Sequence, residues 1–188
     1  MQTTPISLLE QLRSPRPDQA WGRFVDLYTP LLYIWAGRLG AIGPDADDLV
    51  QDVFTTLVQQ LPGFEYDRGA RFRGWLWTVC RNKARERGRR ALVPVTDDNL
   101  DALTGPAEDD PAVVVDEREY RDHITRRAME LMEADFTPET WQAFWEVTVN
   151  GRPAAEVAAS LGTTVNAVYL ARGRVLRRLW TELAGLLD

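Results

Sequence analysis

Apolar residues recur along the chain at the spacing of helices. Trp21, Phe24 and Tyr28 follow one another at intervals of three and four residues, which places them on one side of a helix. Leu49 and Val53 begin a second such line. No stretch alternates apolar and polar residues in the manner of a half-buried strand. The pattern therefore predicts an all-α protein.

Start and stop residues delimit the predicted helices. Asp18 is a capping residue just before one apolar-periodic segment, and Pro44 follows Gly43 at the first position of another, which ends at 62–63. Thr137, followed by proline, repeats the start signal. The predicted helices cover residues 4–12, 18–35, 44–61, 72–90, 117–132, 138–149, 154–161 and 165–180.

The stretch 72–90 changes character half-way along its length. An apolar stripe in its first half is expected to anchor the helix in a core, whereas cations in its second half suit contact with phosphates, which supply most of the affinity for nucleic acid. A solvated basic face is the alternative, and the pattern alone leaves both open. The stripe is Phe72, Trp75, Leu76, Val79 and Cys80, and the cations are Arg81, Lys83, Arg85, Arg87, Arg89 and Arg90.

Two neighbouring segments allow similar alternatives. Asp45, Asp48 and Asp52 lie away from the apolar line of their helix, where they are either solvated or form a docking face for a basic partner. The predicted loop 64–71 combines two aromatic residues with two arginines. Its aromatic rings either stack on unpaired bases or pack into the core.

The chain becomes acidic and rich in helix breakers after Arg90. Nine acids and four Pro or Gly residues fall in 91–119, which predicts an acidic, flexible linker over residues 93–116. This linker divides the chain into two small helical domains, 1–92 and 117–188. In the second domain, the helix 138–149 is expected to bury Trp141, Phe144, Trp145 and Val149.

Residues 154–179 have the layout of a helix-turn-helix. Ala158 allows close approach of the first helix, Gly162 permits the turn, and Val165 and Val168 are expected to seat the second helix. The alternative is an ordinary helical hairpin with an arginine-rich end.

In the helix-turn-helix interpretation, the second helix presents polar residues to a DNA major groove. Asn166, Ala167 and Leu170 are predicted to face outward, and Asn166 suits a base edge. Arg174, Arg177 and Arg178 suit phosphate contacts.

The amino-acid composition excludes several classes of protein and site. The 188 residues include one cysteine, Cys80, and one histidine, His123, which excludes an internal disulfide and leaves no His/Cys metal cluster. The net charge of −6 hides a strong segregation of sign along the chain. The absence of a signal peptide and of a long apolar run predicts a soluble, cytoplasmic protein without membrane insertion.

Three motifs together resemble the extracytoplasmic-function (ECF) sigma factors, bacterial transcription-initiation subunits that keep only regions 2 and 4. The segment D-A-D-D-L-V-Q-D-V-F, 45–54, is similar to the region 2 helix that docks on the RNA polymerase clamp. F-R-G-W-L-W-T-V-C-R-N, 72–82, is similar to the segment leading into −10 recognition, and 151–179 follows the region 4 helix-turn-helix.

The resemblance implies three sets of site residues. Asp48, Gln51 and Asp52 are expected to face polymerase. The −10 DNA contacts are expected from Phe64, Tyr66, Arg68, Arg71, Trp75, Arg81, Asn82, Lys83, Arg85 and Arg89. The −35 DNA contacts are expected from Thr164, Asn166, Ala167, Leu170, Arg174, Arg177 and Arg178. One departure from the family pattern is Arg172, which is expected on the buried side because it follows Val168 by four residues.

The expected function is therefore that of a sigma factor that gives RNA polymerase core enzyme its promoter specificity and opens promoter DNA. An anti-sigma factor is a further expected partner, and neither a catalytic residue, a cofactor nor a metal is expected. The alternative is a two-domain helix-turn-helix regulator acting without polymerase. A nucleic-acid enzyme is a third class, for which the only carboxylate group is Asp45, Asp47, Asp48 and Asp52.

Overall fold

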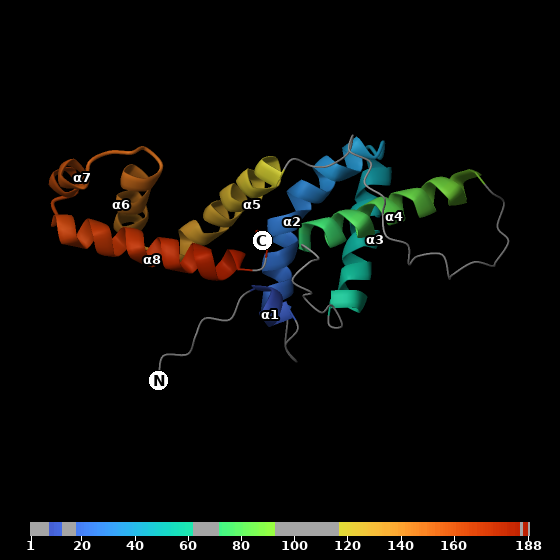
Figure 1. Ribbon diagram of the computed structural model, residues 1–188, viewed down its shortest axis with the longest axis horizontal. Helices are drawn as coiled ribbons and strands as arrows, with labels where there is room; N and C mark the ends of the chain where they lie inside the picture. The colour runs from blue at the N-terminus through green and yellow to red at the C-terminus, as the bar shows by residue number, and fades with distance from the viewer. Residues whose placement is uncertain (1–7, 13–17, 62–71, 93–116, 185, 188) are drawn as a thin grey trace. The chain divides into compact units, whose positions relative to one another are not determined.

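The computed structural model describes residues 8–12, 18–61, 72–92, 117–184 and 186–187, in which every regular element is a helix (Figure 1). The all-α prediction is confirmed for this part of the chain. The helices are α1 (Leu8–Leu12), α2 (Asp18–Arg38), α3 (Pro44–Gln60), α4 (Phe72–Leu92), α5 (Glu117–Met132), the 3-10 turn η3 (Glu133–Asp135), α6 (Pro138–Thr148), α7 (Ala154–Ser160) and α8 (Val165–Leu183). The predicted linker, 93–116, lies outside the described residues.

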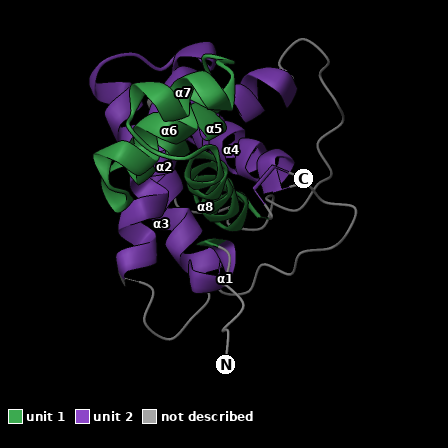
Figure 2. Ribbon diagram, turned by 90° about the vertical axis from the view of Figure 1, so that its left-hand side faces the viewer, with its two compact units in different colours: residues 1–8, 125–184 green, residues 9–124, 185–188 purple. Residues whose placement is uncertain are grey.

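The chain divides into two compact units (Figure 2). Unit 1 combines residues 1–8 with 125–184, and unit 2 combines residues 9–124 with 185–188. Residues 117–124, which the sequence pattern groups with the second domain, therefore belong to unit 2 together with the first three long helices.

Unit 2 is built from α2, α3 and α4, each of which contacts the other two. The apolar lines predicted for α3 and α4 are buried, including Leu57 and Leu76, except for Trp75, which is half-buried. Aromatic rings join the helices, since Phe24 of α2 meets Phe72 of α4 edge-on with ring centroids 6.1 Å apart. This packing fixes how α3 and α4 are rotated about their own axes, and hence where their charged faces point.

A chain of buried hydroxyls lies in the core of unit 2. Tyr120 donates to the carbonyl oxygen of Leu186 at 2.9 Å, and Tyr28 lies 2.8 Å from Tyr120. Because Tyr120 has a single hydroxyl proton, Tyr28 is the donor of the second bond. Burial raises the pKa of both hydroxyls, so both stay protonated at neutral pH.

Cys80 lies on the buried stripe of α4, as its spacing predicts. Burial raises the pKa of its thiol to about 12. The thiolate, which is the reactive form, is therefore not populated near neutral pH.

Unit 1 places α6 and α7 against α8. One cluster joins Ala158 of α7 to Val168 of α8, and a second joins Phe144 of α6 to Val175 of α8. Trp141 and Phe144 are buried as predicted. The prediction was wrong for Trp145 and Val149, which are exposed. Trp145 lies outside the buried side of α6, which is formed by Trp141, Ala143 and Phe144, and Val149 follows the last residue of the helix. The members of the first cluster are Ala143, Ala154, Val157, Ala158, Val168 and Ala171.

A short turn connects α7 to α8. Gly162 has a φ of 62°, the left-handed conformation that glycine adopts without a steric penalty. Thr164 then caps α8, accepting a hydrogen bond from the backbone N–H of Ala167 at 3.1 Å. Val168 seats α8 as predicted, but Val165 is exposed, because the cap places it before the helix turns inward.

Among the described residues, none of the helices has the length and apolar character needed to span a membrane.

The hydroxyl chain gives a test of the unit 2 core. Tyr120→Phe should lower the free energy of unfolding by about 1–3 kcal/mol, because it leaves the buried Leu186 carbonyl without its donor. Tyr28→Phe removes only a donor, and its cost should be smaller, about 0.5–1.5 kcal/mol. Urea unfolding of both variants measures the order, and equal costs would contradict the direction assigned to the two bonds.

Candidate functional site

Helix α3 presents a polar side to solvent. Its buried residues, among them Leu49 and Val53, occupy one side, and Asp48, Gln51 and Asp52 lie on the other or at its edge. The side chains of Asp48 and Asp52 are 60% and 42% exposed. The helix therefore holds two carboxylates one turn apart where another molecule can reach them.

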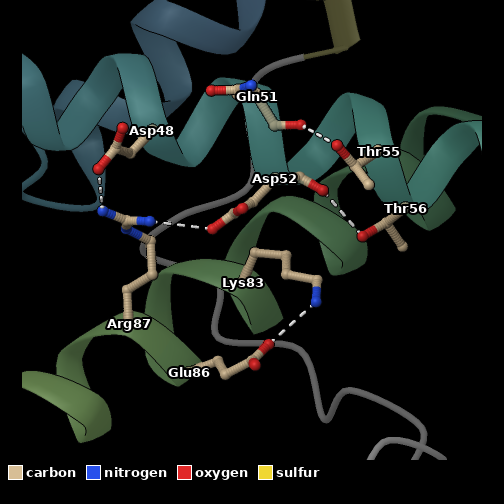
Figure 3. Close-up of polar contacts among 8 residues, drawn as sticks. All are labelled: Asp48, Gln51, Asp52, Thr55, Thr56, Lys83, Glu86 and Arg87. Atoms are coloured by element: carbon tan, nitrogen blue, oxygen red, sulfur yellow. Dashed lines mark hydrogen bonds and ion pairs between the residues drawn. The ribbon is translucent and has the colours of Figure 1, made fainter.

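Arg87 of α4 bridges these two carboxylates (Figure 3). Its two terminal nitrogens lie 2.8 Å from Asp48 Oδ2 and 3.0 Å from Asp52 Oδ2. Hydrogen bonds to Asp52 and then to Asp48 raise the pKa of the Arg87 guanidinium above its ordinary value. The contact joins α3 to the basic half of α4, a pairing that the sequence did not predict.

The sequence contains a weak indication that Arg87 faces a neighbouring helix. Arg87 follows Leu76 by eleven residues and Cys80 by seven, so it continues the buried line of α4 into the basic half. Its side chain consequently turns toward the neighbouring helix. The identity of that neighbour depends on tertiary packing, which the spacing does not supply.

The remaining predicted residues of α4 have different environments. Lys83 pairs with Glu86 on the same helix at 3.0 Å, whereas Arg85 and Arg89 are exposed. Arg81 and Asn82 are half-buried, and the buried Nε of Arg81 has no hydrogen-bond acceptor in the described part of the chain. This half of α4 therefore carries both half-buried and exposed cations.

The structure brings some of the predicted −10 residues together on α4 and leaves others unplaced. Trp75 is half-buried, with its ring centroid 5.6 Å from that of Phe72. Phe64, Tyr66, Arg68 and Arg71 lie outside the described residues. Their part in the site stays a prediction.

A second site lies on α8 of unit 1. Thr164, Asn166 and Leu170 are exposed near the start of the helix, and Ala167 is half-buried beside them. Arg174 and Arg177 are exposed further along. These residues form one outward surface that begins at the turn after α7.

The structure places Arg172 differently from the sequence prediction. Its predicted place on the buried side was wrong, because the buried line of α8 runs through Val168, Ala171 and Val175. Arg172 is exposed and adds to the cations of the helix.

Arg178 lies among acidic partners. It is bonded to Glu182, which is almost completely buried, and its other terminal nitrogen lies 3.5 Å from Asp135 Oδ2. In unit 1 its guanidinium neutralises a buried carboxylate, so it differs from Arg174 and Arg177 in already having an anionic contact.

The acids at the start of α3 do not gather as metal ligands. Asp47 accepts a hydrogen bond from the Tyr33 hydroxyl at 2.7 Å, away from the Asp48 and Asp52 pair. Among the described residues, no group of three or more His, Cys, Asp or Glu side chains is placed to hold a metal ion.

Comparison with known proteins identifies one region of the chain and one similar protein. The model of sigma-70 region 2 matches residues 24–91, which contain α3 and most of α4. The ECF RNA polymerase sigma factor RpoE of Cereibacter sphaeroides is 25% identical over 175 residues, 93% of this chain and 94% of the relative. Residues 24–91 therefore carry a sigma-70 region 2, and the chain resembles an ECF sigma factor over almost its whole length.

One solved structure is also similar to this chain in sequence. The structure of CnrH in complex with the cytosolic domain of CnrY is 26% identical and covers 92% of each chain, with a TM-score of 0.37. A TM-score of this size adds nothing to this resemblance.

The two arginine environments on α8 give a test of unit 1. Arg178→Gln should lower the free energy of unfolding by about 1–3 kcal/mol, because it removes a charged donor from the buried Glu182 carboxylate. Arg174→Gln is the matched control, since Arg174 is exposed and has no ion pair among the described residues. Thermal and urea unfolding compare the two variants, and an unchanged Arg178→Gln protein would show that the pair is not structural.

Proposed function

We propose that this chain is a sigma factor that divides promoter recognition between its two units. The α3 acids dock on RNA polymerase core enzyme, the basic half of α4 and the 64–71 segment hold −10 DNA, and α8 reads −35 DNA. The sequence comparison supports the first part, because the region 2 match over residues 24–91 contains the acids, the 64–71 segment and the basic residues up to Arg90.

Charge supports the polymerase side of this proposal. Asp48, Gln51 and Asp52 form a polar surface on a helix whose other side is buried in the core. Two carboxylates one turn apart can accept hydrogen bonds from cationic side chains of a partner. Such contacts set orientation and association rate more than raw affinity.

Promoter opening would follow from binding energy rather than catalysis. A base removed from the duplex loses stacking energy, which a pocket of aromatic side chains can replace. Phe64 and Tyr66 are the proposed pocket, and Arg81, Asn82, Lys83, Arg85 and Arg89 are the proposed track for the single strand. The half-buried position of Asn82, where the apolar and basic halves of α4 meet, supports a contact close to that strand.

The −35 proposal assigns α7, the turn and α8 the roles of a helix-turn-helix, in which the second helix would enter the major groove. Asn166 and Leu170 would face base edges and thymine methyl groups, while Arg174 and Arg177 would contact phosphates. Thr164 would fix the start of the helix at the groove.

The remaining parts of the proposal concern setting and regulation. The factor would act in the cytoplasm as a binding subunit without an enzymatic activity or cofactor, and an anti-sigma protein would hold it inactive. A regulator acting without polymerase is not favoured, because such a protein has no need of sigma region 2.

Run-off transcription with purified core polymerase tests the docking surface. Wild-type factor should support initiation at a mapped start site, and Asp48→Asn/Asp52→Asn should weaken core binding in a pull-down without loss of helix content. Asp47→Asn is the control for loss of a single charge from α3, because its carboxylate bonds Tyr33 instead of Arg87. Unchanged core binding by the double variant would contradict the docking assignment.

Salt dependence tests the −35 surface. Arg174→Gln should weaken binding to a −35 duplex and flatten the slope of log K against log salt by about 0.9, the value for one lost phosphate contact. A titration over several salt concentrations measures the slope. If the variant keeps the wild-type slope, Arg174 does not contact the DNA backbone.

A further inference from the structure

The Arg87 bridge connects the two surfaces that the proposed function assigns to unit 2. Its guanidinium belongs to the basic half of α4, yet it occupies the acidic side of α3 (Figure 3). Among the described cations of residues 81–89, Arg87 is the one recorded in contact with α3. Lys83 is instead paired within its own helix.

We propose that Arg87 is an exchangeable counter-ion, which occupies the α3 carboxylates in the free factor and is released toward nucleic acid when cationic polymerase side chains replace it. This inference rests on the proposed function, because it requires Asp48 and Asp52 to be the docking residues. It adds to the proposed function a coupling between polymerase docking at α3 and DNA binding at α4.

The geometry leaves a route for exchange. Arg87 bonds Oδ2 of each aspartate, and Oδ1 of each carries no recorded hydrogen bond among the described residues. A carboxylate oxygen has room for more than one donor. A cation of the partner can therefore bind the open oxygens before Arg87 leaves.

The strength of the bridge also favours exchange. Both aspartates are more than one third exposed, and ion pairs in such positions contribute little because water and salt screen them. Two carboxylates and one guanidinium leave one net negative charge on the bridge. Removal of Arg87 restores the second charge, which makes the face more attractive to a basic partner.

Release of Arg87 also adds positive charge to the basic half of α4. The side chain starts from the same helix as Arg85 and Arg89, which are exposed. A freed Arg87 adds one phosphate contact to this basic half. Because coupling between two sites is reciprocal, bound DNA should also favour the docked state.

Core binding gives the first test. Arg87→Gln should bind core polymerase more tightly than wild type, by up to about fivefold, the limit expected for an exposed ion pair. Arg126→Gln is the control, since it removes the same charge from an exposed position of α5 that has no recorded partner in the described part of the chain. Equal or weaker binding by Arg87→Gln would overturn the exchange and make Arg87 a residue that positions the two acids.

The Asp48→Asn/Asp52→Asn variant separates this outcome from failure of the proposed function. If that variant binds core normally, the docking face itself is wrong. If it binds weakly and Arg87→Gln does not bind more tightly, the docking face stands and the exchange fails. Far-ultraviolet circular dichroism and thermal unfolding establish that each variant is folded.

A second test needs no polymerase. The same double variant should bind a single-stranded oligonucleotide more tightly, with a salt slope steeper by about 0.7, the value for one added phosphate contact on a single strand. In an Arg87→Gln background the steeper slope should vanish, whereas in an Arg89→Gln background it should remain. Equal steepening in both backgrounds would overturn the release of Arg87, because it would reflect only the loss of nearby negative charge.

Discussion

Burial of the first half of α4 is the constraint on which the functional surfaces of unit 2 depend. Phe72, Leu76 and Cys80 are buried against α2 and α3, and this fixes the rotation of the whole helix. A helix transmits that rotation along its length, because each residue advances by a constant angle. The basic half is thereby oriented by an apolar half that does not itself contact any ligand in the proposed function.

This division explains how an acidic protein can bind DNA. The calculated isoelectric point is about 4.9, which as an average disfavours a nucleic-acid partner. The structure sets one acidic side on α3 and a basic segment on α4, with a single guanidinium between them. Local fields, rather than the net charge, decide which partner each surface attracts.

Much of the fold could be predicted from local patterns. The start of α3 after Gly43, the cap of α6 at Thr137 and the buried lines of α3 and α4 all depend on residues close in sequence. The wrong predictions are those that overestimated the width of the buried side of a helix. Val165, Arg172 and Trp145 share the periodicity of buried neighbours, but each lies on the edge or the outer side of its helix.

The candidate site was harder to predict, because some of its contacts join different helices. The outward positions of Asn166 and Leu170 follow from one helix alone, and the sequence placed them correctly on the surface. The contacts of Arg87 with α3 and of Arg178 with Asp135 require knowledge of which elements are neighbours. The sequence grouped both arginines with basic segments. Glu182, in contrast, follows Arg178 by four residues on the same helix, so helical spacing alone could have indicated that pair.

The buried position of Cys80 limits how this factor can respond to its surroundings. The chain has one cysteine, and its thiol is enclosed in the core of unit 2 and remains protonated near neutral pH. A peroxide or a disulfide reagent therefore meets no reactive sulfhydryl on the folded factor. Any oxidant-dependent control through thiols would have to be exercised by another protein.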